Sequence, residues 1–261
     1  MWNNNNNNKN KIKIKNKIYN NNKNKNKNKN KNKNTKTPEQ LLRRLENPDS
    51  LVRRSAAEHP DATAEVLMRA LADGDADVRL KAAAHPNATA EVLMRALACG
   101  DGCDRWAAAS HRNATPGVLM KALEDGDVDV RCAAATHLYA TAEVLMKALV
   151  DGDVEVRLKA AAHPHATAEV LMKALVDERG EVRRRAAGNP NATAETLLKA
   201  LEDKDGHVRF VAAAHPDATA EVLMRALADK DRHVRNKAQE KIGSDPLLGL
   251  LVASLKGDAG S

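Results

Sequence analysis

The chain has 261 residues, of which 43% are hydrophobic but only 2% aromatic, and it has a net charge of +7. Twelve lysines and no acidic residue lie in residues 1–36, so the rest of the chain has a net charge of −5 (+7 less 12) and lacks the basic surface that duplex phosphates require. Three cysteines form no disulfide framework, and no apolar stretch reaches the roughly 18 residues of a membrane span.

The first segment, residues 1–35, is of low complexity. Up to residue 34 it consists of Asn and Lys apart from Met1, Trp2, Ile12, Ile14, Ile18 and Tyr19. Such a segment buries too little apolar surface to offset its ordering entropy, so we expect it to be disordered. Its lysines leave one functional alternative, which is weak binding of nucleic acid or of an acidic partner. The chain begins without the apolar core of a secretory signal, so a cytoplasmic or nuclear location is expected.

Residues 36–243 repeat with a period of 26. The phrase A-T-A-E-V-L-M-R-A-L begins at Ala62 and again at Ala88, and no insertion or deletion interrupts the array. Eight units begin at residues 36, 62, 88, 114, 140, 166, 192 and 218. A unit of this size buries only a small apolar stripe, so each unit should be stable only when it is stacked on its neighbours.

The first half of each unit predicts an amphipathic helix. In the second unit Thr63 is a good N-cap for a helix over residues 64–73. Successive steps of 100° place Val66, Leu67 and Ala70 on one face of this helix. That face should contact the core.

The second half of each unit predicts another helix of similar length. Asp73-Gly74-Asp75 makes the turn, Asp75 caps a helix over residues 76–85, and Pro86 ends it. Val78 and Ala82 should lie against the core. The unit is therefore a pair of helices of about ten residues each.

Residues 244–261 predict one further helix, from Leu247 to about Lys256. Its leucines make it more apolar than the polar outer face that usually ends a repeat array. We expect a capping helix that lies flat on the last repeat. A dimerisation surface is the alternative.

The phrase T-P-E-Q-L-L-R-R-L in the first unit and D-x-D-V-R-x-x-A-A-A-H-P in later units resemble the leucine-rich repeat variant (LRV) family, and they are similar to HEAT-like repeats. The resemblance implies an all-α, right-handed α-solenoid of eight helix-pair repeats, in which one helix of each pair can be short or of the tighter three-residue type. It implies that the second helices form the inner face. It also implies that Asp75, Arg79 and their equivalents link loop to helix and repeat to repeat. Some family members carry a cysteine cluster before the repeats, and no Cys precedes Cys99 here, so an iron–sulphur function is not inherited.

Two sets of side chains invite a metal-binding interpretation. The first is a histidine that recurs at one position of the repeat, at His59, His85, His111, His137, His163 and His215. Stacked helices lie about 8–10 Å apart, so these rings can meet at best in pairs, whereas zinc needs four donors. We expect them to bond helix-end carbonyls instead. The second set, Cys99, Cys103 and Cys132, also falls short of a closed site. No metal, cofactor or catalytic residue is expected, and the protein is interpreted as a non-enzyme.

One position of the repeat varies from unit to unit. We call it the variable column, and it consists of Arg54, Leu80, Trp106, Cys132, Leu158, Arg184, Phe210 and Asn236. It lies on the second helix on the side opposite the core, and it includes Trp and Arg, which often anchor interfaces. The hypothesis is a scaffold that holds a peptide or protein segment in a concave groove along this column, with Tyr139 nearby. The alternative is random drift at exposed sites.

Overall fold

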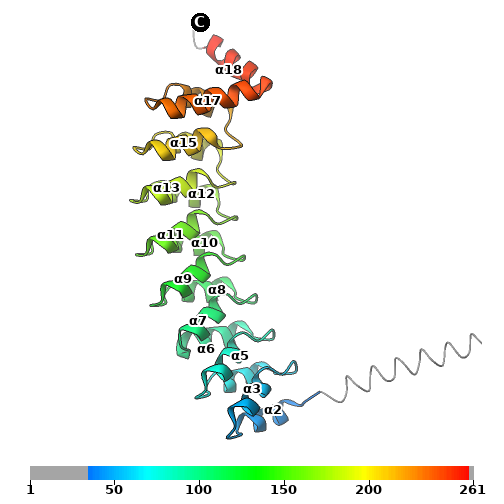
Figure 1. Cartoon of the computed structure of the whole chain (residues 1–261). Coiled ribbons are helices and arrows are strands. Elements are labelled where there is room, and N and C mark those ends of the chain that lie inside the picture. Colours follow the sequence, from blue (N-terminus) through cyan, green and yellow to red (C-terminus); the bar gives the residue numbers. More distant parts are fainter. Residues whose placement is uncertain (1–34, 259–261) are drawn as a thin grey trace, which may run out of the picture.

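The computed structural model describes residues 35–258, and within that range it contains 17 helices and no strand. The helices stack in pairs along one column (Figure 1). This confirms the predicted all-α solenoid. The segment expected to be disordered lies outside the described residues except for Thr35.

Each repeat contributes one first helix and one second helix. The first helices are α2 (Pro38–Leu45), α4 (Ala64–Ala70), α6 (Ala90–Cys99), α8 (Pro116–Ala122), α10 (Ala142–Ala148), α12 (Ala168–Ala174), α14 (Ala194–Ala200) and α16 (Ala220–Leu227). The second helices are α3 (Ser50–Ala57), α5 (Ala76–Ala83), α7 (Gly102–Ala109), α9 (Val128–Ala135), α11 (Val154–Ala161), α13 (Gly180–Ala187), α15 (Gly206–Ala214) and α17 (Arg232–Ser244). Helices of both sets are α-helices and not 3-10 helices, the tighter type with three residues per turn.

Most helices are shorter than the ten residues predicted from the sequence. Helix α4 ends at Ala70 instead of residue 73, with Leu71 as its C-cap. The chain turns soon afterwards because the Asp73 carboxylate accepts the backbone N–H of Asp75 at 2.9 Å. That bond holds the loop in place of a further helical turn.

The second helices other than α17 are also short, and a side-chain bond fixes the turn that follows α5. Helix α5 ends at Ala83, before the predicted residue 85. Nδ1 of His85 accepts the backbone N–H of Asn87 at 3.0 Å, which fixes a turn after the helix. A proline in the next position is compatible with this turn but does not by itself set the last helical residue.

The predicted caps are present with one difference. Asp75 accepts hydrogen bonds from the backbone N–H groups of Asp77 and Val78, as an N-cap residue should. Thr63 occupies the N-cap position of α4 but makes no side-chain cap bond. Its equivalent Thr89 makes that bond to Val92.

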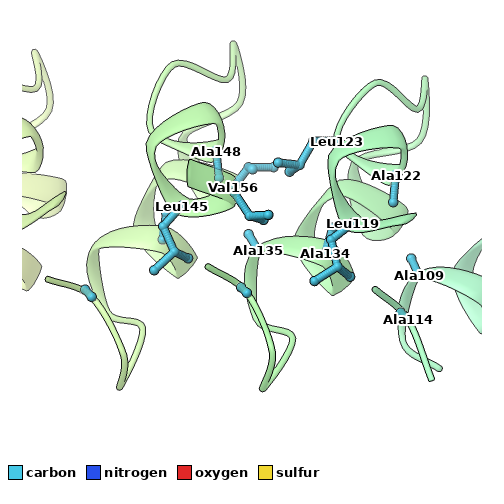
Figure 2. Packing of buried hydrophobic residues seen from close by; sticks show 14 of the residues in the cluster. Ala109, Ala114, Leu119, Ala122, Leu123, Ala134, Ala135, Leu145, Ala148 and Val156 are labelled. Atoms are coloured by element: carbon cyan, nitrogen blue, oxygen red, sulfur yellow. The ribbon is translucent and has the colours of Figure 1, made fainter. Parts of the chain in front are cut away.

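The core is a stack of similar layers, one for each repeat (Figure 2). Each first helix contributes a leucine that is 0% exposed, at Leu41, Leu67, Leu93, Leu119, Leu145, Leu171, Leu197 and Leu223. Each second helix contributes small residues, such as Ala134 and Ala135 in α9, which are also 0% exposed. Alanine lets neighbouring helices approach closely, which explains how a chain with so few aromatic residues closes its core.

The array ends in α18 (Pro246–Asp258), which packs against α16 and α17. Val252 is buried in this contact, while Leu247, Leu250 and Leu251 are exposed. The helix therefore covers the last repeat, as predicted for a cap, and it leaves part of its apolar surface uncovered.

Candidate functional site

A ladder of arginine–aspartate pairs joins successive repeats. In each pair the arginine on a second helix reaches an aspartate 20 residues later, in the loop of the next repeat. The pairs are Arg53–Asp73, Arg105–Asp125, Arg131–Asp151, Arg157–Asp177, Arg183–Asp203 and Arg209–Asp229. The same guanidinium also holds its own loop, as when Nη1 of Arg183 donates to the carbonyl oxygens of Asp177 and Glu178.

The ladder agrees with the roles that the family resemblance implies, and it adds a residue that sequence reasoning missed. Asp75 links loop to helix as a cap, and Arg79 links repeat to repeat. The partner of most ladder arginines, however, is the equivalent of Asp73 and not of Asp75. Asp occupies this position in six of the eight units, and this recurrence could have identified the residue from the sequence.

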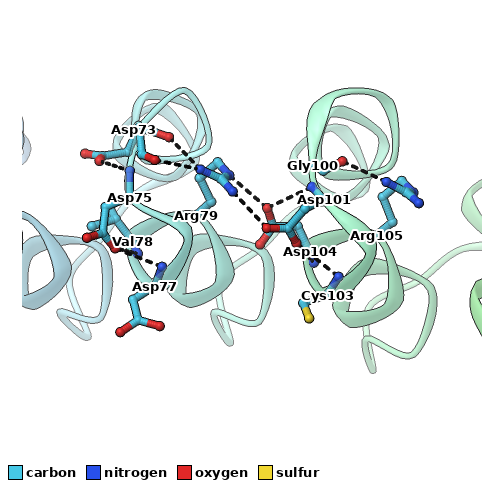
Figure 3. Close-up of polar contacts among 11 residues, drawn as sticks. Asp73, Asp75, Asp77, Val78, Arg79, Gly100, Asp101, Cys103, Asp104 and Arg105 are labelled. Carbon is cyan, nitrogen blue, oxygen red and sulfur yellow. Dashed lines mark hydrogen bonds and ion pairs between the residues drawn. The ribbon is translucent and has the colours of Figure 1, made fainter.

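The third repeat replaces this pair with a different one (Figure 3). Cys99 stands where six units have Asp, and Asp104 stands where the other seven have Val. Arg79 instead donates to Asp104 at 3.0 Å and to Asp101 at 2.9 Å. Asp104 is 0% exposed, and its Oδ1 has no hydrogen-bond partner among the described residues.

The two exchanges in the third repeat should be coupled. Asp104→Val alone is expected to destabilise the protein because Arg79 loses its buried partner. In most other repeats an aspartate at this position pairs with the ladder arginine, so Cys99→Asp alone would compete with Asp104 for Arg79 and should also destabilise. The double variant restores the repeat pattern, so we expect a favourable coupling free energy of about 1–3 kcal/mol in a double-mutant cycle of urea unfolding. Additive single effects would contradict this account.

The recurring histidines form a second ladder between repeats. Nε2 of His85 lies 3.0 Å from the carbonyl oxygen of His59, and the same contact recurs 26 residues on at His111, His137 and His163. Because Nδ1 of each ring accepts a backbone N–H, Nε2 must carry the proton and donate it. The rings are therefore neutral and bonded at both nitrogens. As predicted they bond backbone carbonyls near helix ends, but each carbonyl belongs to the preceding repeat and not to the ring's own helix.

Other residues continue the histidine ladder. Asn189 takes the histidine position and donates from Nδ2 to the carbonyl of His163, while its Oδ1 accepts the N–H of Asn191. His215 then donates to the carbonyl of Asn189, and Lys241 to that of His215. Both ladders stabilise the stack, so neither contains the candidate binding residues.

The structure places the residues of the variable column in different environments. Trp106 is 51% exposed and Phe210 is 37% exposed, and Arg184 is also exposed. Leu80, Cys132 and Leu158 are half-buried and pack against the edge of the core, which differs from a fully outward column. The second helices pack against one another, so a side chain at this position also contacts the neighbouring repeat. Arg54 forms an ion pair with Asp77 at 3.3 Å.

Four of the predicted binding residues come together around one hollow of about 1240 Å³ beside α7 and α9. They are Leu80, Trp106, Cys132 and Tyr139. The lining does not include Arg54, Leu158, Arg184 or Phe210. The candidate site is thus a local hollow over the third and fourth repeats and not a continuous groove along the whole column.

The hollow lies where the repeat pattern is broken. Ala133 stands where the next repeat has Lys159, so a long side chain is missing from the floor. Leu138 replaces a proline that five units share, and Tyr139 follows it with 58% of its surface exposed. The Tyr139 ring lies 5.7 Å from the ring of His137. Large apolar side chains therefore rise around a floor of small ones.

Charges are unevenly distributed around the hollow. Asp101 and Asp127 are the N-cap residues of α7 and α9, and Asp129 follows in the first turn of α9. Arg112 lies beyond the opposite end of α7, and Lys159 lies on the next second helix. The helix N-termini therefore form an acidic edge of the hollow.

Cys132 contributes an apolar surface to this lining. Burial raises the pKa of its thiol above the ordinary value, so the thiol stays protonated at neutral pH. A protonated, half-buried thiol packs like a small apolar group. Cys103 also lines the hollow and is a free, exposed cysteine.

Within residues 35–258, no group of three or more His, Cys, Asp or Glu side chains is arranged to hold a metal ion. None of the helices in this range has the length and apolar character needed to cross a membrane.

Comparison with solved structures shows similarity to a leucine-rich repeat variant with a novel repetitive structural motif. The two chains are 26% identical, the match covers 77% of this chain and 80% of the other, and the TM-score is 0.56. Two engineered proteins also match. The first is 19% identical, the match covers 83% of this chain and 81% of the other, and the TM-score is 0.37. The second is 22% identical, the match covers 78% of this chain and 94% of the other, and the TM-score is 0.25. No protein-family model and no curated protein matches the sequence.

Proposed function

Because the chain is an α-solenoid with the fold of a leucine-rich repeat variant, we propose that it is a non-catalytic protein-interaction scaffold that binds a peptide segment in the hollow beside α7 and α9. Solenoids of this kind present extended binding surfaces and commonly serve as interaction scaffolds. The proposed binding residues are Leu80, Trp106, Cys132 and Tyr139. A cytoplasmic or nuclear location is part of the same proposal, because the three cysteines form no disulfide framework.

One observation carries this proposal: two of the three Trp, Tyr and Phe side chains in residues 35–258 line a single hollow. Trp106 and Tyr139 come from adjacent repeats, and Leu138 lies beside them where five units have proline. The third aromatic residue, Phe210, lies outside the hollow. Exposed aromatic side chains around a small-residue floor are suited to anchoring one or two apolar side chains of a partner.

The rest of the variable column is assigned a secondary role. Phe210, Arg184, Leu158 and Arg54 lie outside the hollow. A long segment that follows the column would contact them after its anchor is bound. Their individual contributions to affinity should therefore be small compared with that of Trp106.

A second candidate function is binding of nucleic acid or of an acidic partner through the tail, residues 1–35, and the eleven lysines of this segment favour it. Such binding would depend steeply on salt. Deleting residues 1–35 would abolish it, whereas capture by the hollow would remain.

The proposal predicts a clear difference between two aromatic residues at the same repeat position. Peptides selected from a random library on the full chain at high salt should converge on a motif with an apolar anchor. Trp106→Ala should weaken their binding about 30-fold or more, which corresponds to about 2 kcal/mol for an anchor residue. Phe210→Ala is the matched control and should change affinity by less than about threefold.

Calorimetry and fluorescence anisotropy with the selected peptide measure both effects, and circular dichroism checks that each variant keeps its helices. Trp106 is half exposed, so its replacement should leave the fold intact. A selection without convergence, or equal affinity of the Trp106→Ala variant and the unmodified chain, would refute the proposal.

A further inference from the structure

The lining of the hollow fits a segment that alternates apolar and cationic side chains. Trp106, Leu80 and Leu138 provide the apolar wall, and Asp101, Asp127 and Asp129 provide the acidic edge. The chain itself contains such a segment, K-I-K-I-K-N-K-I-Y at residues 11–19. We propose that residues 11–19 occupy the hollow of the same chain. This inference rests on the hollow being a peptide-binding surface, as proposed above.

The spacing within the segment matches the two sides of the hollow. In an extended backbone successive side chains point to opposite faces. Ile12 and Ile14 then share one face and Lys11, Lys13 and Lys15 share the other. The isoleucines would contact the wall around Trp106, while the lysines would lie along the acidic edge.

The distribution of charge favours this partner over a neutral one. Residues 1–36 carry twelve positive charges, and the rest of the chain carries −5. Among the residues that line the hollow, Asp101 is already paired with Arg79, which leaves Asp127 and Asp129 beside Arg112 and Lys159. The attraction therefore comes mainly from the net negative charge of the rest of the chain and should assist docking at low salt, while the isoleucines provide the specific contacts.

The segment can reach the hollow. Tyr19 lies 16 residues before Thr35, and 16 extended residues span up to about 53 Å. The hollow lies over the third and fourth repeats. Three successive spacings of second helices, from α3 to α9, amount to about 30 Å at 8–10 Å each.

Because residues 11–19 belong to the same chain as the hollow, a weak contact is sufficient for them to occupy it. A segment tethered by a short flexible linker has an effective concentration on the order of millimolar at its site. Occupancy then requires only millimolar intrinsic affinity. Residues 11–19 would therefore compete with an external peptide for the same hollow and set a threshold for its binding.

The test uses Trp106 as its reporter. The chain has two tryptophans, so Trp2→Phe leaves Trp106 alone. In this background the accessibility of Trp106 to acrylamide is compared between the full chain and a chain with Ile12→Asn, Ile14→Asn and Ile18→Asn, which keeps every charge. We expect quenching of Trp106 to be about twofold weaker in the chain that keeps the isoleucines, because the tethered segment covers the ring.

A matched reporter controls for unspecific contact of the tail. Trp106→Phe with Phe210→Trp, again with Trp2→Phe, moves the single tryptophan to the same repeat position outside the hollow. Quenching at position 210 should be equal with and without the three isoleucines. A synthetic peptide of residues 9–20, added to the asparagine variant, should restore the protection of Trp106.

Equal quenching of Trp106 with and without the isoleucines would overturn the inference, as would the same protection at position 210. The proposed function has its own readout. If a library-selected peptide still binds both chains in a Trp106-dependent way with equal affinity, the hollow is a binding surface but residues 11–19 do not occupy it. If no peptide binds either chain, the proposed function fails as well.

Discussion

Replacing Arg183 with methionine is expected to lower the free energy of unfolding by about 3–5 kcal/mol. The Arg183 side chain is 7% exposed and its partner Asp203 is 6% exposed. Methionine keeps the aliphatic stem but removes both hydrogen bonds to Asp203 and those to two loop carbonyls. The main source of the loss is a buried carboxylate without its cationic partner, since Asp203 then keeps only the hydrogen bond from the backbone N–H of Asp205 at 2.8 Å.

We also expect the Arg183→Met variant to unfold in two separate transitions. Stability in a solenoid is close to a sum of unit stabilities and interface terms between neighbours. Arg183 lies on α13 and Asp203 in the next repeat, so the variant weakens one interface in particular. We expect the repeats after residue 191 to unfold at lower urea than those before it.

Urea unfolding followed by circular dichroism measures both effects. Arg185→Met on the same helix is the matched control, since Arg185 is exposed, and it should change the free energy of unfolding by less than about 0.5 kcal/mol. Similar unfolding curves for the Arg183→Met and Arg185→Met variants would show that the arginine–aspartate ladder does not hold the repeats together.

Acidification is expected to destabilise the solenoid well before its carboxylates are protonated. Burial lowers the pKa of His85, His111 and His163 below the ordinary value of 6.5, although each ring also has a backbone hydrogen bond that acts in the opposite direction. The nearby Arg112 lowers the pKa of His111 further. Protonated rings would also lose the acceptor at Nδ1 that fixes the turn.

The direction of the effect follows from proton linkage. Below pH 6.5 the unfolded chain binds protons that the folded chain does not. The free energy of unfolding is therefore highest above pH 6.5 and falls as the pH drops toward the folded-state values. Each of the three histidines contributes to this slope. Melting temperatures between pH 7.5 and 5.5 measure it.

Asparagine provides a variant that separates titration from hydrogen bonding. Asn189 shows that an amide makes the same two bonds as the ladder histidines. His163→Asn should therefore keep stability at pH 7.5 but reduce the slope by about a third, because it removes one of the three titrating rings. His163→Ala should lose about 1–3 kcal/mol at pH 7.5. A slope that is unchanged in the His163→Asn variant would contradict the assignment.

Much of the fold could be predicted because every unit repeats the same local signals. The period of 26, the aspartate caps and the leucine of each first helix indicate stacked helix pairs without any information on neighbours. The helix lengths were predicted less well. They depend on bonds made after the last helical residue, such as that from Asn87 to the His85 ring, which apolar periodicity does not report.

The candidate site was predicted only in part. Variation at one repeat position identified Leu80, Trp106 and Cys132, and Tyr139 was added as a nearby loop residue. The same criterion also selected Arg54, Leu158, Arg184 and Phe210, which lie outside the hollow. Comparing one position across the repeats shows which side chains vary, but it does not show where the surface between them forms a hollow.

The sequence by itself determined the repeat, its two helices and the residues of its core, because these depend on periodicity and capping within one unit. Only the tertiary structure decided which side chains meet between units. Arg183 pairs with Asp203 of the next repeat, and Asp104 pairs with Arg79 in place of the aspartate missing at residue 99. The small side chain of Ala133 lines the hollow together with Trp106 and Tyr139. These contacts join residues 20 or more positions apart, or in adjacent repeats, and they depend on how one helix pair is set against the next.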